Sequence, residues 1–504
     1  MKKILLLTAV FMAAGAFSVA VADGNNENNK YEKEKSVKQT KSAEKPQLII
    51  SGEASFHPNF GNPSNKYYGK AVESTSGKDS DAGKVTKSGF ENNVARDFKN
   101  DIKYDKANKD TSMTRFVAGE ADIDVKAIGK LDNGIEYMVE FDIDAMKDDT
   151  EVDKMYLSFS RDDLGTLHLG NVKGPDAKCI YSGQQLLGGT CGMDGTIPHS
   201  FDFATGVIAP VYMIGNSSKA TKIAYYTPRF YGFQLSASIT PDTKHFGHND
   251  KDWRAGSGST GNDNGMFVKG KGDHKPTGRN NIAVALTHTH EFSNGIRTKL
   301  SGIYLSEDTK KLDVLSYTRS KKTDATDIER LEVKAKAKLR KVSAYQLSAT
   351  VGYKKWDIGI GFLDNGRSRT LKSLTCTSGN LANDVKVEDL IGNFLGTSKA
   401  NAGKAWNIGA RYQLNDQWTI SGVFHHTKRK VDTDSYTRGN MLTLAADWKI
   451  VDGLAVFFEA DYIKTKSSEV ACQRYNMIYK DDKDKNAIKK QNGTLFAVGV
   501  KVCF

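Results

Sequence analysis

The chain ends on TLFAVGVKVCF (494–504), where apolar and other residues alternate up to an aromatic last residue. Successive side chains of a β-strand point to opposite sides, so alternation gives an extended chain one apolar face. That face carries Phe496, Val498, Val500, Val502 and Phe504. Because the mean hydropathy of the whole chain is only −0.50, the apolar ending is a local feature. The pattern predicts a final β-strand that is buried in, or faces, an apolar environment on one side.

The same two-residue period recurs upstream, for example in LAVFFEADYI (454–463) and MLTLAADWKI (441–450). We predict sixteen strands on this basis. They are 47–56, 115–131, 135–146, 152–162, 166–171, 220–227, 232–240, 281–292, 296–306, 343–353, 356–364, 404–414, 417–429, 440–450, 454–465 and 494–504.

The connections between these strands alternate in length. Seven are tight, namely 132–134, 163–164, 229–231, 293–295, 354–355, 415–416 and 451–453. The Asn-Gly and Asp-Gly sequences among them are typical of hairpin turns. The others are mostly long, namely 57–114, 172–219, 241–280, 307–342, 365–403 and 466–493, with 147–151 and 430–439 as the short exceptions. An even strand count with short turns at one end and long loops at the other predicts an all-β fold, a transmembrane antiparallel β-barrel. Trp356, Trp406, Trp418 and Tyr462 fit its aromatic girdles.

The N-terminus predicts export. Residues 1–22 read as a signal peptide, with Lys2 and Lys3 before an apolar stretch and Ala20-Val21-Ala22 as the cleavage site. Residues 23–46 are polar and low in complexity, which predicts a disordered spacer, and the barrel spans 47–504. Outside the signal peptide, no segment reaches the roughly 20 apolar residues that a spanning helix needs.

The five cysteines all lie in the exported part, where disulfides can persist. Cys179 and Cys191 lie in one loop and could bridge locally, but the connectivity does not follow from the sequence.

Three segments carry a resemblance to a known family. MYLSFSRDDLGTLHLGN (155–171), KATKIAYYTPRFYGFQLSASI (219–239) and AWNIGARYQLNDQWTISGVF (405–424) resemble the general diffusion porins of Gram-negative bacteria, of the trimeric proteobacterial type. The resemblance implies a homotrimer in the outer membrane, with both termini in the periplasm. It also implies that Phe504, closing an alternating strand, is the signal read by the outer-membrane assembly machinery.

The third long-end connection, 172–219, contains an unusually apolar stretch, QQLLGGTCGMDGTIPHSFDFATGVIAPVYMIG. A solvated loop should be polar, so this one is expected to pack on something. The resemblance implies that it folds into the barrel and narrows it, with Asp176, Asp194 and Asp202 as its acidic candidates and Lys178 as its basic one. A loop at a subunit contact or on the surface is the alternative.

The hairpin ADIDVKAIGKLDNGIEYMVEFDIDAM (121–146) predicts an acidic lumen wall. If its turn centres on Asn133, the facing pairs are Asp122 with Asp144, Asp124 with Asp142, and Lys126 with Glu140. Facing like charges are destabilising, so the cluster needs water, mobile cations, a basic side chain or bound Ca²⁺, for which carboxylate oxygens are suitable ligands. The porin family usually has arginines on the wall facing acids on the third loop, and this hairpin departs from that arrangement.

Basic lumen candidates lie elsewhere, at Arg297, Lys299, Arg411, Lys449 and Lys501. We nevertheless expect a mild cation preference, because the charge lining the lumen matters more than the formal net charge of +12. The segment 328–353 keeps one alternation from Leu331 to Val351, which predicts a strand extending beyond the membrane with a basic face. Anionic lipopolysaccharide is a candidate partner for that face, and a solvated charged face is the alternative.

The sequence lacks the phosphate-loop, HExxH and GxSxG signatures of common enzyme classes. We therefore expect a passive channel for ions and small hydrophilic solutes, embedded in outer-membrane lipid, without catalysis, cofactor or nucleic-acid partner. A solute-specific channel and a surface adhesin or structural barrel are the alternatives.

Overall fold

The computed structural model describes residues 46–63, 71–73, 102–104, 113–144, 151–192, 213–243, 278–309, 312–321, 328–378, 401–430, 436–467 and 490–504. All of them belong to one compact unit, Ala43–Phe504. The predicted signal peptide (1–22) and all but the last residue of the predicted spacer (23–46) lie outside the described residues, so both stay predictions.

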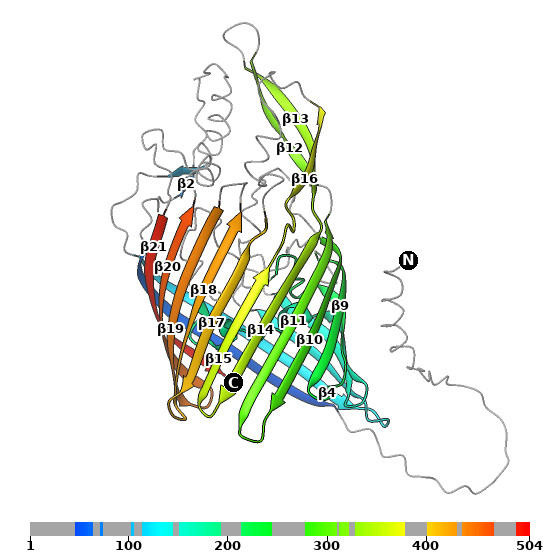
Figure 1. Cartoon of the computed structure of the whole chain (residues 1–504), viewed down its shortest axis with the longest axis vertical. Helices are drawn as coiled ribbons and strands as arrows, with labels where there is room; N and C mark the ends of the chain where they lie inside the picture. The colour runs from blue at the N-terminus through cyan, green and yellow to red at the C-terminus, as the bar shows by residue number, and fades with distance from the viewer. Residues whose placement is uncertain are drawn as a thin grey trace, which may run out of the picture. The chain divides into compact units, whose positions relative to one another are not determined.

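The described strands form a closed antiparallel barrel of sixteen, which confirms the predicted fold (Figure 1). Each predicted strand has its counterpart, with ends that differ by a few residues. The barrel strands are β1 (Gln47–Pro63), β4 (Met113–Lys130), β5 (Glu136–Asp144), β6 (Glu151–Arg161), β7 (Gly165–Asn171), β8 (Thr221–Tyr226), β9 (Phe233–Asp242), β10 (Gly278–Glu291), β11 (Ile296–Thr309), β14 (Val342–Tyr353), β15 (Trp356–Asp364), β17 (Lys404–Gln413), β18 (Trp418–Lys430), β19 (Tyr436–Val451), β20 (Leu454–Ser467) and β21 (Lys490–Cys503).

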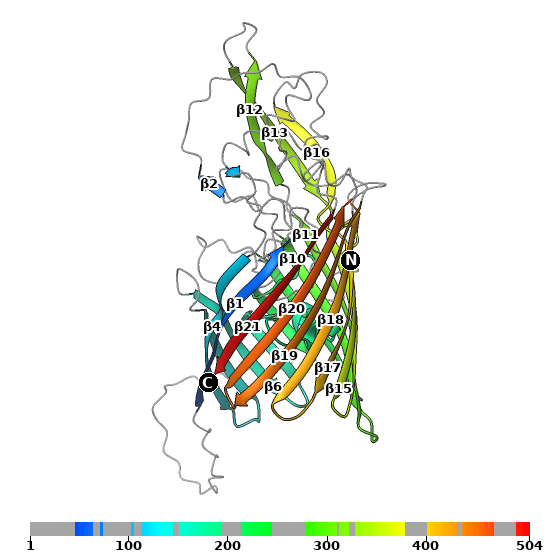
Figure 2. The ribbon, with the colours of Figure 1, turned by 90° about the vertical axis from the view of Figure 1, so that its left-hand side faces the viewer.

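The barrel closes where the first strand meets the last. β1 pairs with β4 on one side and with β21 on the other, so neither end of the sheet is left as an open edge (Figure 2). The final residue takes part in this closure: the Gly52 amide donates to the Phe504 carbonyl at 2.9 Å, and the Phe504 amide donates to the Gly52 carbonyl at 3.0 Å. The apolar ending of the chain is therefore the strand that seals the barrel.

Burial alternates along the strands as the sequence pattern predicts. On β14 Leu347 is 53% exposed on the outside, whereas its neighbour Gln346 is 3% exposed on the inside. The outer face as a whole carries large apolar side chains, and their exposure fits a surface that is solvated by lipid rather than by water. Aromatic pairs lie at strand ends near the tight turns, such as Trp356 with Tyr412 and the stacked Trp418 and Trp448.

Several of the tight turns owe their shape to glycine. Gly134 in the β4–β5 turn and Gly453 in the β19–β20 turn have φ angles of 82° and 84°, a region that residues with a Cβ avoid. In the first of these turns the Asn133 side chain accepts a hydrogen bond from the Ile135 amide at 3.1 Å.

The predicted extension above the barrel exists, but it is not one continuous strand. The strand is interrupted at residues 340–341, where the backbone pairs with the loop before β16 (Leu371–Ser378). There the Arg340 amide donates a hydrogen bond to the Thr370 carbonyl at 2.8 Å. Beyond the break, β13 (Ile328–Leu339) pairs with β12 (Leu312–Lys321) and β16 in a separate three-stranded sheet. A further pair of short strands is β2 (Ala71–Glu73) with β3 (Ile102–Tyr104).

A charge on the outer face should destabilise the barrel, whereas the same charge on the inner face should not. We expect Leu347→Arg to lower the free energy of unfolding by about 2–4 kcal/mol, the usual cost of an arginine facing the middle of a bilayer. Thr350→Arg, on the inner face of the same strand, is the matched control, because its guanidinium reaches water. Urea unfolding in lipid vesicles measures both, and equal losses for the two variants would mean that the faces are wrongly assigned.

Candidate functional site

We call the connection between β7 and β8, residues 172–220, the inner loop, because its described residues lie against the inner wall of the barrel. The structure describes it at 172–192 and 213–220, including the short helix α3 (Pro175–Lys178) and the 3₁₀ turn η1 (Gly183–Leu186). Its first half is held by inward-facing side chains of successive wall strands. The Tyr181 amide donates to the Ser348 hydroxyl at 2.8 Å, and the Gln184 amide donates to the Asn407 side-chain oxygen at 3.3 Å.

The inner loop then continues across three more strands. The Gly188 amide donates to the Ser421 hydroxyl at 2.9 Å, and the Gly189 amide donates to the Asp447 carboxylate at 3.0 Å. Thr190 donates to Glu459 twice, through its amide at 2.5 Å and through its hydroxyl at 2.9 Å. Five backbone amides of the loop are thus satisfied by side chains from β14, β17, β18, β19 and β20.

Apolar packing explains why this loop is so poor in polar residues. Ile180 and Met213 of the inner loop form one buried cluster with inward-facing wall residues such as Ile303, Leu305 and Val342. Leu187 packs similarly against Val423 and Ala445. Inward-facing leucine and isoleucine would be costly against water, and the loop covers them. For its described residues, 172–192 and 213–219, the loop packs on the inner wall as expected, and the apolar residues at 193–212 lie outside the described part of the chain.

A buried lysine fastens the root of the inner loop. The Lys222 ammonium, only 2% exposed as a residue, donates to the carbonyls of Val172 at 2.5 Å, Ser218 at 2.7 Å and Ala220 at 2.7 Å. These carbonyls belong to the outgoing and the returning stem, so one side chain joins both. Charge-assisted bonds of this kind are the stronger hydrogen bonds in proteins.

Asp176, predicted as an acidic residue of the constriction, lies in this root instead. It is fully buried, and its carboxylate accepts hydrogen bonds from the Ser217 amide at 2.8 Å and the Ser217 hydroxyl at 3.2 Å. Burial raises the pKa of this carboxyl, and the nearby Lys222 ammonium and the Ser217 donors oppose that rise. Asp176 therefore joins the two stems rather than facing water.

Of the other three charged residues predicted on this loop, the structure describes one. Lys178 is exposed and its ammonium lies 5.6 Å from the centre of the Tyr156 ring on β6. Asp194 and Asp202 lie outside the described residues, so their roles stay predictions.

The acidic hairpin has the predicted register. Asp122 faces Asp144, Asp124 faces Asp142, and Lys126 faces Glu140 across β4 and β5. The hydrophobic members of the hairpin, such as Ile123 and Phe141, are exposed on the outer face. The acidic residues therefore share the inner wall that lies beside β6.

The counter-charge that this wall requires comes mainly from a lysine that the sequence analysis did not select. Lys154 on β6 places its ammonium 2.7 Å from Asp142, 3.6 Å from Asp124 and 3.8 Å from Glu140. Lys126 lies 3.8 Å from Glu140, and Lys219 of the inner loop lies 3.7 Å from Asp142. Alternation puts Lys154 on the inner face. Its pairing with Asp142 does not follow from counting residues across the β5–β6 connection, because the register shifts by one residue between Asp142 and Ile143.

The basic lumen candidates lie towards the tight-turn end of the barrel, and several are paired. Arg297 and Arg411 both bind Asp357, with shortest distances of 3.2 and 2.8 Å. Lys501 lies 2.8 Å from Glu53, and Lys449 contacts Asp452 in the adjoining turn. Lys299 lies over the Tyr181 ring of the inner loop, 5.8 Å from its centre.

The candidate disulfide between Cys179 and Cys191 is not formed. Cys179 is a buried free thiol whose sulfur lies 3.7 Å from the Ser236 hydroxyl on the wall, which keeps it packed in the root of the loop. Within the described residues, no group of three or more His, Cys, Asp or Glu side chains is arranged to hold a metal ion.

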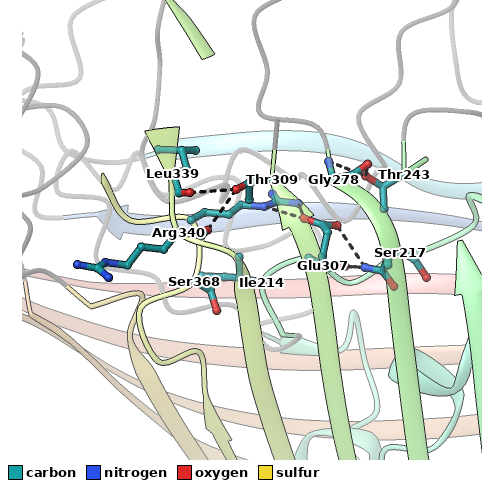
Figure 3. Close-up of polar contacts among 12 residues, drawn as sticks. Ile214, Ser217, Thr243, Gly278, Glu307, Thr309, Leu339, Arg340 and Ser368 are labelled. Atoms are coloured by element: carbon teal, nitrogen blue, oxygen red, sulfur yellow. Dashed lines mark hydrogen bonds and ion pairs between the residues drawn. The ribbon is translucent and has the colours of Figure 1, made fainter. Parts of the chain in front are cut away.

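A second network ties the returning stem to the long-loop end of the barrel (Figure 3). Glu307 on β11 is fully buried and accepts a hydrogen bond from Arg369 at 2.9 Å and one from Asn281 at 3.2 Å. The Ile214 amide of the inner loop donates to the Asn365 side-chain oxygen at 2.8 Å. The inner loop is thus fixed at its root, along the wall and where it returns.

Comparison with known proteins now identifies the family. A family model described as Gram-negative porin matches residues 72–468, which is most of the chain. The chain belongs to the Gram-negative porin family. Among the described residues, no helix combines the length and the apolar character needed to cross a membrane.

Relatives of this porin include an uncharacterized protein of Rickettsia conorii, 28% identical over 244 residues that cover 42% of this chain and 54% of the relative. A similar protein of Rickettsia prowazekii is 27% identical over the same length and with the same shares. The porin thus spans about half the length of the curated relatives it matches.

Similar solved structures include the outer membrane channel DcaP of Acinetobacter baumannii, with a TM-score of 0.47, 10% identity and coverage of 91% of this chain and 98% of that one. Another is an anion-selective porin from Comamonas acidovorans, with a TM-score of 0.46, 11% identity and coverage of 91% and 100%.

Removal of the buried root lysine should destabilise this porin. Lys222→Met leaves three buried carbonyls without a donor, and we expect the free energy of unfolding to fall by roughly 3 kcal/mol. Lys173→Met, an exposed lysine of the same loop, is the matched control and should change it by less than about 0.5 kcal/mol. Urea unfolding in vesicles measures both, and a loss no larger for Lys222→Met than for the control would show that the root does not depend on this ammonium.

Proposed function

We propose that this porin forms a water-filled channel through which ions and small hydrophilic solutes diffuse passively across the outer membrane. The observation that carries the proposal is a closed barrel of sixteen described strands, with an inner loop bound along one wall and charged groups on the opposite one. A barrel of about eight strands is filled by its own side chains, whereas one of sixteen leaves room for water.

The inner loop is proposed to narrow this channel. The hydrogen bonds of its residues 181–190 run from β14 to β20, so this part of the loop lies on that side of the lumen. At its root, Lys219 and Lys178 reach β5 and β6. Solutes then pass beside the loop, along β21, β1 and β4. The contacts to Ser348, Asn407, Ser421 and Glu459 support this, because they hold the loop backbone against the inner wall of the barrel.

The charges on the open wall support a mild preference for cations. Asp122 and Asp124 lie on the inner face there, beside the buried Glu140 and Asp142. Lys126, Lys154 and Lys219 offset part of this negative charge. Charged rings and walls of one sign raise the local concentration of the opposite ion. Because the lysines lie among the carboxylates, we expect the preference to be weak.

The proposal also covers the export, assembly and orientation of the channel. We infer that the chain is exported by its signal peptide, assembles as a homotrimer in lipid and lipopolysaccharide through the assembly machinery that reads Phe504, and keeps both termini in the periplasm. It needs no cofactor and carries out no covalent chemistry, because selective diffusion down a gradient requires only a lined passage.

The proposal predicts how the channel responds to loss of the acidic wall. Changing Asp122, Asp124, Asp142 and Asp144 together to Asn should move the cation-to-anion permeability ratio from above one to one or below, because the lysines then outnumber the remaining acid. Reversal potentials across a planar bilayer in a KCl gradient measure this ratio.

The matched control removes aspartates that do not face the lumen. Asp132, Asp162 and Asp416 are exposed in the short turns, and their combined change to Asn should leave the ratio nearly unchanged. An anion preference in the parent protein would contradict the proposed polarity. An unaltered ratio in the four-residue variant would remove the acidic wall from the account.

A further inference from the structure

The backbone of the inner loop touches the backbone of the wall at η1, over two strands that have glycine at that level. Gly359 on β15 and Gly409 on β17 face each other directly in the sheet register, and both belong to the inward-facing set. Gly183, the first residue of η1, lies on top of this pair. We call these three residues the glycine seat.

The fit at the glycine seat leaves no room for a methyl group. A Cβ on Gly409 would lie 2.5 Å from the Gly183 carbonyl oxygen, and a Cβ on Gly359 would lie 2.9 Å from the Gly183 nitrogen. From the other side, a Cβ on Gly183 would lie 2.3 Å from the Gly409 nitrogen. All these neighbours are backbone atoms, which cannot rotate away as the tip of a side chain can.

Glycine inside a strand weakens it, since it has no side chain to pack and loses more conformational freedom on folding. Two paired glycines on the inner face therefore call for an explanation. Glycine inside a strand often marks a place where another backbone approaches closely. None of the three has a positive φ, so backbone conformation does not explain them.

Hydrogen bonds on both sides hold η1 down on the seat. Tyr181 is bound to Ser348 on β14 and Gln184 to Asn407 on β17, one or two residues from Gly183. η1 itself is closed by a capping box, in which the Ser182 hydroxyl accepts from the Gln184 amide and the Gln185 side chain accepts from the Ser182 amide. The loop therefore meets the wall as a preformed turn.

We infer that the glycine seat sets the width of the passage, by letting the inner loop lie flush against the wall. This inference rests on the proposed channel function. A methyl group at the seat needs an ordinary contact distance of at least 3.4 Å, so at Gly409 it would move the loop about 1 Å from the wall. Since the wall is continuous, the loop can move only into the lumen, and the passage becomes narrower.

Single-channel conductance in planar bilayers tests the seat. Gly409→Ala and Gly359→Ala should each lower the conductance of the open channel, with the larger loss for Gly409→Ala, where the shortfall in distance is greater. In liposome swelling, both variants should lose uptake of the largest sugars that the parent admits before they lose uptake of small ones. Each current step reports one folded, inserted assembly, so a poorer folding yield does not lower its height.

Gly302→Ala is the matched control. Gly302 is also a strand glycine, but it faces outwards on β11, and a Cβ there would meet only the Leu347 side chain at 3.5 Å, an ordinary contact. It should keep the parental conductance and size limit. A conducting parent with unchanged or larger currents in both seat variants would overturn the seat and leave the channel standing. A parent that inserts but carries no current would overturn both.

Discussion

The structure depends on one constraint, that every backbone N–H and C=O within the lipid must find a partner inside the protein. A sheet meets this constraint only if it has no free edge. Here the last strand provides the partner for the first, down to the paired backbone bonds between Gly52 and Phe504. The outward apolar face and the inward polar face follow from that closure, because alternation along each strand then separates lipid from water.

The inner loop extends the same constraint into the lumen. Its backbone leaves the sheet and must be satisfied elsewhere, and the wall provides hydroxyl, amide and carboxylate oxygens at Ser348, Asn407, Ser421, Asp447 and Glu459. In return the loop covers inward-facing apolar residues of β11 and β14 that would otherwise meet water. The loop and the wall behind it are thus complementary, and the charged residues of β4 and β5 lie on the opposite wall, where they pair with Lys126 and Lys154.

Much of the fold could be predicted from the sequence, because a period of two and a closed sheet leave few choices. The register of the β4–β5 hairpin followed from Asn133 alone, and each facing acidic pair is where that count puts it. The count fails where the chain is irregular. The shift at Asp142 conceals Lys154, and the break at residues 340–341 divides a strand whose alternation looks continuous.

The site was less predictable, because its contacts join residues far apart in the chain. Alternation places Asp447 and Glu459 on the inner face, but only the path of the inner loop makes them acceptors for Gly189 and Thr190. Asp176 shows the reverse error, since an acid on the loop was read as a pore charge and is instead a buried link between stems.

Single-channel recording of the full-length protein in planar bilayers tests the central claim most directly. We expect discrete, long-lived current steps at both polarities, whose height rises with salt concentration. Folded and inserted protein that carries no current would contradict the claim that this barrel is a channel.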